Sequence, residues 1–286
     1  MTPELSPRTD SPALGPILNR MRCPRCAAAL TIGDERVACE SGHTFPVRDG
    51  VPLLAILGTA ATWADAADAE TSADYQREYQ EEGKAKRYNE AYRDRPTKRW
   101  STEREYRLLE RHLGSRPRAG VLLDIPSGGG RLSGVLSRHA DLLVEADIGL
   151  GQILYGRERA RETAADGSRV WITASAFHIP FKDRSVDGVV CCRLCHHLPA
   201  AEERERLVAE LLRVARDFVV MTFFDYHSVK NYIRRARRPF SGLPPKMTMT
   251  VDRVAELARS AGAELVAWPA LSHLFSGHRY ALMVKR

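Results

Sequence analysis

Three cysteines and one histidine near the start of the chain have the types and spacing of a metal site. Two residues separate Cys23 from Cys26, twelve separate Cys26 from Cys39, and three separate Cys39 from His43. Three thiolates and one imidazole form a ligand set that closes a tetrahedral zinc site. Because four protein ligands leave no position for water, we predict a structural zinc. The surrounding segment is poor in large apolar side chains and needs a bound metal ion to fold.

A glycine-rich turn is the second group of residues with chemical meaning. An apolar segment ends at Asp124 and continues through Gly128, Gly129 and Gly130 into a predicted helix. Open α/β sheets bind ligands at the carboxyl ends of their strands, and glycines let the backbone approach a ligand closely. The G-x-G-x-x-G pattern of dinucleotide-binding proteins fails here. Asp124, together with Asp147 at the end of the next predicted strand, fits a ligand with an amino group and a ribose diol, such as S-adenosylmethionine.

Alternating apolar segments and amphipathic segments must position these residues. The alternation predicts a parallel sheet covered on both faces, followed by an antiparallel pair at the sheet edge. The predicted strands are 121–125, 142–147, 170–173, 187–192, 218–223, 264–268 and 278–284. The predicted helices are 131–139, 152–162, 201–213 and 251–260. Shorter strand-like pieces at 28–32, 36–39 and 44–47 surround the cysteine pairs.

Four blocks of the chain, in order, resemble the motifs of class I S-adenosylmethionine-dependent methyltransferases. They are Leu123–Arg131, Glu145–Ile148, Ala176–Asp187 and Cys192–Leu198, and the resemblance covers residues from about 118 to 286. It implies a Rossmann-like α/β fold, with a seven-stranded, mostly parallel sheet that has an antiparallel edge strand. A small N-terminal zinc-binding module is added to this fold.

The resemblance also implies roles for individual residues. The glycines would lie against the methionine part of the cofactor, Asp124 near its amino group, and Asp147 on the ribose. The remaining implied cofactor-binding positions are Pro126, Ser127, Ile148, Ser175, Ala176, Phe177, Cys192 and Arg193. Two positions depart from the family pattern. Pro126 replaces the first glycine, and Ser175 replaces the acidic residue that usually accepts from the adenine amino group, leaving an uncharged acceptor.

The zinc module resembles two kinds of known module. Its cysteine and histidine spacing is that of bacterial 23S rRNA guanine-N1 methyltransferases, and Cys23-Pro24 and His43-x-Phe45 add to the likeness. The following residues, 45–54, look more like the small zinc-ribbon activators of other methyltransferases. RNA is therefore one candidate acceptor.

A second cysteine group has two interpretations. Cys191, Cys192, Cys195, His196 and His197 have metal-ligand types, but neighbours on a strand point to opposite faces. We therefore favour a segment without metal that faces the methyl group. His197 is a candidate general base for an acceptor hydroxyl, and a hydrogen-bonded wall residue is the alternative.

Composition and charge exclude several classes of protein. The chain has 286 residues, with 44% hydrophobic and 28% charged residues, which excludes extensive disorder. Its longest apolar run is too short to span a bilayer, and no secretory signal is recognisable, so we expect no membrane association and a cytoplasmic location. We expect a disordered leader over 1–20, the zinc module over 21–58, a linker and helical lid over 59–117, and the methyltransferase domain over 118–286.

The combined evidence predicts transfer of a methyl group from S-adenosylmethionine to an N or O atom. The formal net charge of +7 favours a polyanion such as RNA. A basic run after the fifth strand, suited to a phosphate backbone, consists of Lys230, Arg234, Arg235, Arg237 and Arg238. The alternatives are a small-molecule methyltransferase and a non-catalytic scaffold for an RNA or protein partner.

Overall fold

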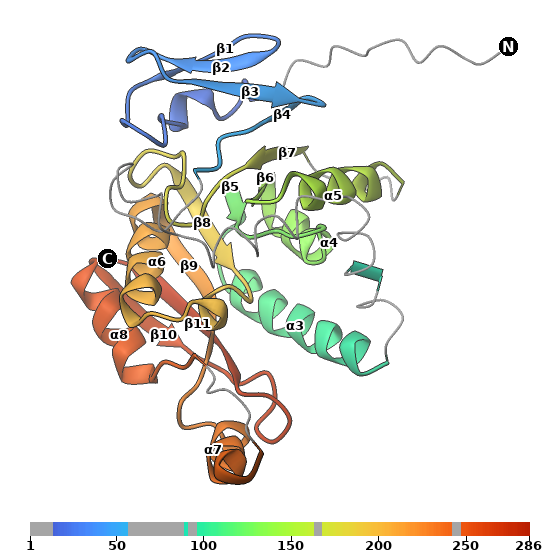
Figure 1. The fold of residues 1–286 in the computed structure, drawn as a ribbon, viewed down its shortest axis with the longest axis vertical. Helices are drawn as coiled ribbons and strands as arrows, with labels where there is room; N and C mark the ends of the chain where they lie inside the picture. The colour runs from blue at the N-terminus through green and yellow to red at the C-terminus, as the bar shows by residue number, and fades with distance from the viewer. Residues whose placement is uncertain (1–13, 57–88, 91–95, 163–167, 242–246) are drawn as a thin grey trace, which may run out of the picture.

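The computed structural model describes residues 14–56, 89–90, 96–162, 168–241 and 247–286 (Figure 1). Its main feature is a seven-stranded sheet with the strand order β10-β11-β9-β8-β5-β6-β7. The strands are β5 (Ala119–Asp124), β6 (Ala140–Asp147), β7 (Ser168–Thr173), β8 (Val186–Cys191), β9 (Ala215–Phe224), β10 (Ala263–Ala267) and β11 (His278–Lys285). Strands β5 to β9 pair in parallel, and β11 is antiparallel to both β9 and β10. The predicted Rossmann-like fold is confirmed, and the reversed strand is β11, with β10 outside it.

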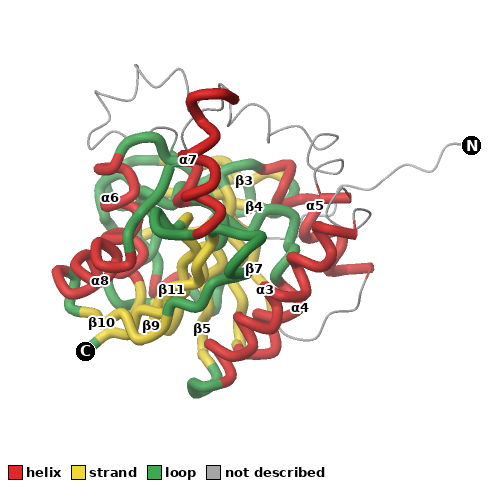
Figure 2. Tube along the Cα trace, turned by 90° about the horizontal axis from the view of Figure 1, so that it is seen from below, coloured by secondary structure: helices red, strands yellow, loops and turns green. Residues whose placement is uncertain are grey.

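Helices cover both faces of this sheet, as the apolar character of its strands requires. On one face lie α3 (Pro96–Gly114), α4 (Ser133–Leu136) and α5 (Leu150–Glu162), and on the other α6 (Ala201–Val214) and α8 (Val251–Ser260) (Figure 1). Leu109 of α3 and Leu211 of α6 are both fully buried, in separate apolar clusters on opposite faces of the sheet. Helix α7 (Val229–Ser241) follows β9 and stands apart from these layers (Figures 1 and 2).

The N-terminal module is a small sheet in the order β1-β2-β3-β4. Its strands are β1 (Leu30–Ile32), β2 (Arg36–Cys39), β3 (Thr44–Arg48) and β4 (Val51–Pro52). The chain after β4 continues along the edge of the large sheet, where the N–H of Leu54 donates to the carbonyl oxygen of Thr173 at 3.1 Å. Buried side chains of the module belong to the same apolar cluster as the α6 face of the large sheet. The module is therefore packed onto the β7 edge.

Several element boundaries differ from the predictions for physical reasons. The predicted leader over 1–20 is wrong for its last seven residues, because Leu14 and Ile17 are fully buried beside the short helix η1 (Leu18–Arg20). The helix predicted over 131–139 is reduced to α4 and one 3-10 turn, because the glycine turn extends through its first residues. Of the linker and helical lid predicted over 59–117, residues 59–88 and 91–95 lie outside the described part of the chain, and α3 begins at Pro96. The other domain boundaries remain predictions.

Candidate functional site

The predicted cofactor-binding residues gather at one edge of the sheet. Asp124 is the last residue of β5 and Asp147 the last of β6, while Ser175 and Cys192 follow shortly after β7 and β8. These four strands are neighbours and run in parallel, so their carboxyl ends meet. The fold therefore brings together residues that are up to 68 positions apart in the sequence.

The glycine turn after β5 is fixed by backbone hydrogen bonds to both neighbouring strands. The N–H of Ile125 donates to Val190 at 2.9 Å, and the N–H of Ser127 donates to Ala146 at 2.8 Å. Gly128 and Gly130 have positive φ angles of 55° and 72°, a conformation that favours glycine. Pro126 lies inside this turn, between the two anchoring hydrogen bonds. The backbone conformation of this turn therefore favours glycine at positions 128 and 130.

Asp147 closes the turn from the side of β6. Its two carboxylate oxygens accept from the N–H of Gly128 and the N–H of Gly149, each at 2.9 Å. Burial raises the pKa of Asp147 to about 6, although backbone donors, including the N–H of Ile148, oppose this rise. A carboxylate has about four lone-pair sites, and these bonds take two of them. The remaining sites match the two hydroxyls of a ribose.

Asp124 is the most unusual polar group of this region. The residue is fully buried, and neither of its carboxylate oxygens has a hydrogen-bond partner within the described part of the chain. Burial raises the pKa of Asp124 well above its ordinary value, and the negative charge of Glu145 raises it further. A buried polar group without a partner costs about 1–3 kcal/mol. This orphaned carboxylate fits the amino group of a bound ligand, directly or through a water.

Two residues at this turn were missed by the sequence analysis. The side chains of Asn89 and Tyr155 occupy the space beside Gly129, and a Cβ at that position would lie only 2.6 Å from the Tyr155 ring. The Asn89 amide donates to the side-chain oxygen of Gln152, on the same helix as Tyr155, at 2.9 Å. Gly129 is therefore needed for packing. No motif signalled Asn89, because the residues it contacts, Gly129 and Gln152, are 40 and 63 positions away in the sequence.

The predicted adenine segment forms a tight turn after β7. Ser175 is buried, and its hydroxyl oxygen accepts from the N–H of Phe177 at 3.3 Å. Ala176 is buried, and Phe177 is half-buried with the guanidinium of Arg206 5.8 Å from its ring centroid. The Ser175 hydroxyl thus stabilises its own turn. The Ser175 hydroxyl can still donate its proton and accept one further hydrogen bond.

The segment after β8 is held by helix α3. The backbone N–H of Arg193 donates to the hydroxyl of Thr222 at 2.6 Å, and its Nε donates to the buried carboxylate of Glu105 at 2.7 Å. Arg131 pairs with the same carboxylate. Burial by itself would raise the pKa of Glu105, but the two guanidinium groups lower it below its ordinary value. Glu105 therefore ties α3 to both the glycine turn and the segment after β8.

The second cysteine group does not form a metal site in the described part of the chain. The only candidate cluster of at least three ligands there is the N-terminal one. Cys191 and Cys192 are buried, and burial raises the pKa of both thiols. They therefore behave as apolar packing residues.

The histidines after β8 are arranged differently from the sequence expectation. His197, the predicted general base, is exposed. Its neighbour His196 lies between rings, with centroids 4.2 Å from His197 and 4.7 Å from His278 of β11. The His278 ring in turn lies 5.3 Å from Phe224, at the end of β9. The carboxyl ends of β8 and β9 thus present three imidazoles next to one another.

The four N-terminal ligand residues converge as their spacing predicts. The ligand atoms of Cys23, Cys26, Cys39 and His43 all lie within 4.8 Å of one another. The Sγ atoms of Cys26 and Cys39 are 3.7 Å apart, and the Cys39 Sγ is 3.5 Å from the His43 Nδ1. With Zn–S bonds of about 2.3 Å, tetrahedral geometry places two sulfurs about 3.8 Å apart. The cluster therefore has the dimensions of a zinc site.

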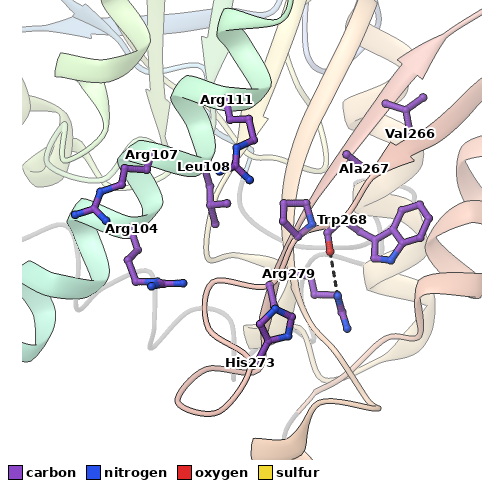
Figure 3. Close-up of a pocket in the computed structure, with 11 residues that line it drawn as sticks. Arg104, Arg107, Leu108, Arg111, Val266, Ala267, Trp268, His273 and Arg279 are labelled. Carbon is purple, nitrogen blue, oxygen red and sulfur yellow. Dashed lines mark hydrogen bonds between the residues drawn. The ribbon is translucent and has the colours of Figure 1, made fainter.

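A basic cavity of about 640 Å³ lies away from the glycine turn, between α3 and the β10–β11 connection (Figure 3). Arg104, Arg107 and Arg111 line it from α3, opposite His273 and Arg279. Arg107 pairs with Glu103 of the same helix at 3.9 Å, and two other arginines have partners in the wall of the cavity. Arg104 donates to the carbonyl oxygen of Leu271 at 2.6 Å, and Arg279 is paired with the buried Asp225 at 2.6 Å. These two arginines thus fasten the wall of the cavity.

Comparisons with known proteins agree with this fold. Residues 123–221 match a family model described as a methyltransferase domain. The solved structure of magnesium protoporphyrin IX methyltransferase from Synechocystis PCC 6803, with bound S-adenosylhomocysteine, has a TM-score of 0.63 at 16% identity, covering 75% of this chain and 99% of that chain. The PH0226 protein from Pyrococcus horikoshii OT3 has a TM-score of 0.52 at 17% identity, covering 69% and 99% of the two chains. No curated protein sequence matches this chain significantly.

These similarities define the class of fold. The chain has the Rossmann-like fold of class I S-adenosylmethionine-dependent methyltransferases, and the match to the methyltransferase domain model lies within its large sheet. Another similar structure is named as the [4+2]-cyclase SpnF, with a TM-score of 0.51 at 15% identity, covering 64% of this chain and 80% of that chain. The fold therefore leaves the reaction to be argued from the site. None of the helices in the described ranges combines the length and apolar character needed to cross a bilayer.

Proposed function

We propose that this protein is an S-adenosylmethionine-dependent methyltransferase that acts on an N or O atom. The observation that carries the proposal is the pair of buried carboxylates beside the glycine turn. Asp124 has two unpartnered oxygens among the described residues, and Asp147 keeps free lone-pair sites after binding two backbone N–H groups. An amino group and a ribose diol are the donors that such a pair accepts. The match to a methyltransferase domain supports the same ligand.

Each part of the site has a role in this proposal. S-adenosylmethionine supplies, when bound, a methyl group activated on a sulfonium. The backbone of Gly128–Gly130 contacts its methionine part, Asp124 accepts from its amino group, and Asp147 accepts from its ribose hydroxyls. Ser175, Ala176 and Phe177 border the adenine. Positioning of donor and acceptor supplies most of the acceleration in such a transfer, so little covalent chemistry is required of the protein.

The residues after β8 face the acceptor in this proposal. Glu105 fixes the side chain of Arg193, and this contact holds the segment of Cys192 and Arg193 in place. His197 remains the candidate that takes a proton from the acceptor. The ring contacts with His196 place a second imidazole next to it, and a second imidazole is a suitable relay for that proton.

A structural zinc ion belongs to the proposal. Cys23, Cys26, Cys39 and His43 supply four ligands, and their sulfur–sulfur and sulfur–nitrogen separations suit a tetrahedral ion. Such an ion closes the N-terminal module, which packs on the β7 edge of the large sheet. Zinc binding then contributes to folding and takes no part in methyl transfer.

The acceptor has two candidate classes. The net charge of +7 favours RNA. A solved structure with the same fold is named for a porphyrin substrate, which favours a small molecule as the second candidate. Ser175 stands where the family pattern has an acidic residue that accepts from the adenine amino group. This loss of a charged cofactor contact supports a third possibility, a non-catalytic scaffold.

Mass spectrometry of RNA and metabolites from cells with and without the gene tests this proposal. Loss of one methylated nucleoside identifies an RNA acceptor, and loss of one methylated metabolite identifies a small-molecule acceptor. Calorimetry separates these outcomes from the scaffold. Absence of heat with both S-adenosylmethionine and S-adenosylhomocysteine would contradict the methyltransferase proposal and favour the scaffold.

A further inference from the structure

Helix α7 carries an apolar stripe that faces away from the protein. Val229, Tyr232 and Ile233 have i, i+3, i+4 spacing and so share one helical face. Their exposed fractions are 45%, 66% and 46%. The buried residue of the helix is polar instead: Asn231 is buried, and its amide donates to the carbonyl oxygen of Tyr226, in the connection that precedes the helix, at 2.8 Å. This orientation is the reverse of an ordinary surface helix, whose apolar stripe packs on the core.

A neighbouring loop extends the exposed apolar surface. Leu274 and Phe275, between β10 and β11, have exposed fractions of 63% and 72%. The Nζ of Lys230 on α7 donates to the carbonyl oxygen of Phe275 at 3.0 Å, which joins the loop to the helix. We define the α7 patch as Val229, Tyr232, Ile233, Leu274 and Phe275. Single exposed apolar residues are normal, but a group of this kind indicates an interaction surface.

The charges of α7 define the partner. The helix contains no acidic residue, and its basic residues are Lys230, Arg234, Arg235, Arg237 and Arg238. A helix with aromatic and aliphatic residues on one face and several basic residues on the rest is typical of helices that lie in the interface of an anionic membrane. An RNA backbone would use the basic residues. It would gain little from the aliphatic side chains of Val229, Ile233 and Leu274.

We propose that the α7 patch binds the surface of a membrane that contains anionic lipids. The apolar side chains enter the boundary between headgroups and acyl chains, and the basic residues contact lipid phosphates. Such a helix lies on the membrane and does not cross it, so the expectation of no membrane association, which rested on the lack of a spanning apolar run, does not apply to this kind of contact. Helix α7 follows the carboxyl end of β9, and the loop precedes β11 at the same edge of the sheet. Bound in this way, the protein turns its site edge toward the lipid.

Flotation of the full-length, zinc-loaded protein with vesicles tests the proposal without S-adenosylmethionine. We expect binding to vesicles of phosphatidylcholine mixed with the anionic lipid phosphatidylglycerol, and much weaker binding to pure phosphatidylcholine. The double variant Leu274→Ser/Phe275→Ser should lower the partition coefficient at least about tenfold. The double variant Arg237→Ala/Arg238→Ala should lower it about thirtyfold for the anionic vesicles only.

Matched controls keep the test decisive if a variant is perturbed. Val266→Ser removes an apolar side chain that is 48% exposed on β10, outside the patch, and Arg259→Ala removes an exposed charge of α8. Both should bind vesicles like the unchanged protein, and circular dichroism should show all four variants folded. Binding that is equal for the two lipid mixtures, or unchanged in Leu274→Ser/Phe275→Ser, would overturn the proposal. Tight binding of a short RNA, with none to vesicles, would assign the basic residues to RNA instead.

Discussion

The raised pKa of Asp147 predicts a specific pH dependence of cofactor binding. Burial raises the pKa of this carboxyl to about 6, above its ordinary value of 3.8. A raised pKa means that the fold disfavours the charged form, so the contribution of Asp147 to stability is present at low pH and is lost as the pH rises through about 6. The difference of about two pKa units corresponds to about 3 kcal/mol. Hydroxyl donors of a ribose favour the charged form, so binding recovers part of this energy.

The size of the expected change in affinity follows from the fraction of Asp147 carboxyl groups that is ionised at each pH. At pH 7 most of the Asp147 population is charged, whereas at pH 5 only about a tenth is charged. Affinity for S-adenosylhomocysteine should therefore fall about tenfold between pH 7 and pH 5. In Asp147→Asn the affinity should be about 1–3 kcal/mol weaker at pH 7 and nearly independent of pH in this range, because no carboxylate remains to titrate.

Titration calorimetry at several pH values measures this effect. Asp141→Asn is the control, since Asp141 lies at the exposed start of the same strand and should keep the pH dependence of the unchanged protein. Zinc content is measured at each pH, because protons compete with metal for thiolates and imidazole. Equal affinity of the folded, unchanged protein at pH 5 and pH 7 would refute the reasoning. So would the same tenfold loss in Asp147→Asn.

Three further predictions concern stability, packing and metal content. Glu105→Gln removes a buried carboxylate and leaves the half-buried Arg131 and Arg193 without a counter-charge, so it should lower the free energy of unfolding in urea by about 3–5 kcal/mol. Glu103→Gln on the exposed side of α3 should change this free energy by less than about 0.5 kcal/mol. Gly129→Ala should lower the free energy of unfolding by about 1–3 kcal/mol because the new Cβ overpacks the site, whereas Gly134→Ala, with open space around its Cβ, should leave it unchanged. Equal effects of the two substitutions would contradict the tight contact at Gly129. Elemental analysis should find one zinc per chain and less than one in Cys39→Ser, and two equivalents would contradict the single site.

The sequence predicted the parts of the site whose signals are local. The spacing of the N-terminal cysteines and His43 is set within one small module, so it predicted their convergence. Asp124 and Asp147 end apolar segments, and parallel strands bring such ends together without further information. The order of strands and helices followed from the alternation of apolar and amphipathic segments.

The parts of the site that the sequence did not predict depend on contacts between residues far apart in the chain. Glu105 has no local motif, and its role is visible only when Arg193, 88 positions away, is placed next to it. Asn89 is similar. The burial of Leu14 and Ile17 had a weak signal in their spacing of three residues, but the surrounding prolines and charges predicted a leader. The spacing of apolar residues in α7 was visible, whereas their orientation away from the body depends on the buried Asn231.

A crystal structure of the zinc-loaded protein with S-adenosylhomocysteine tests the central claim most directly. We expect density for the ligand at the carboxyl ends of β5, β6 and β7, with the ribose hydroxyls on Asp147, the amino group near Asp124 and the adenine beside Ser175–Phe177. Density in the cavity between α3 and the β10–β11 connection, or an unoccupied glycine turn at saturating ligand, would contradict it.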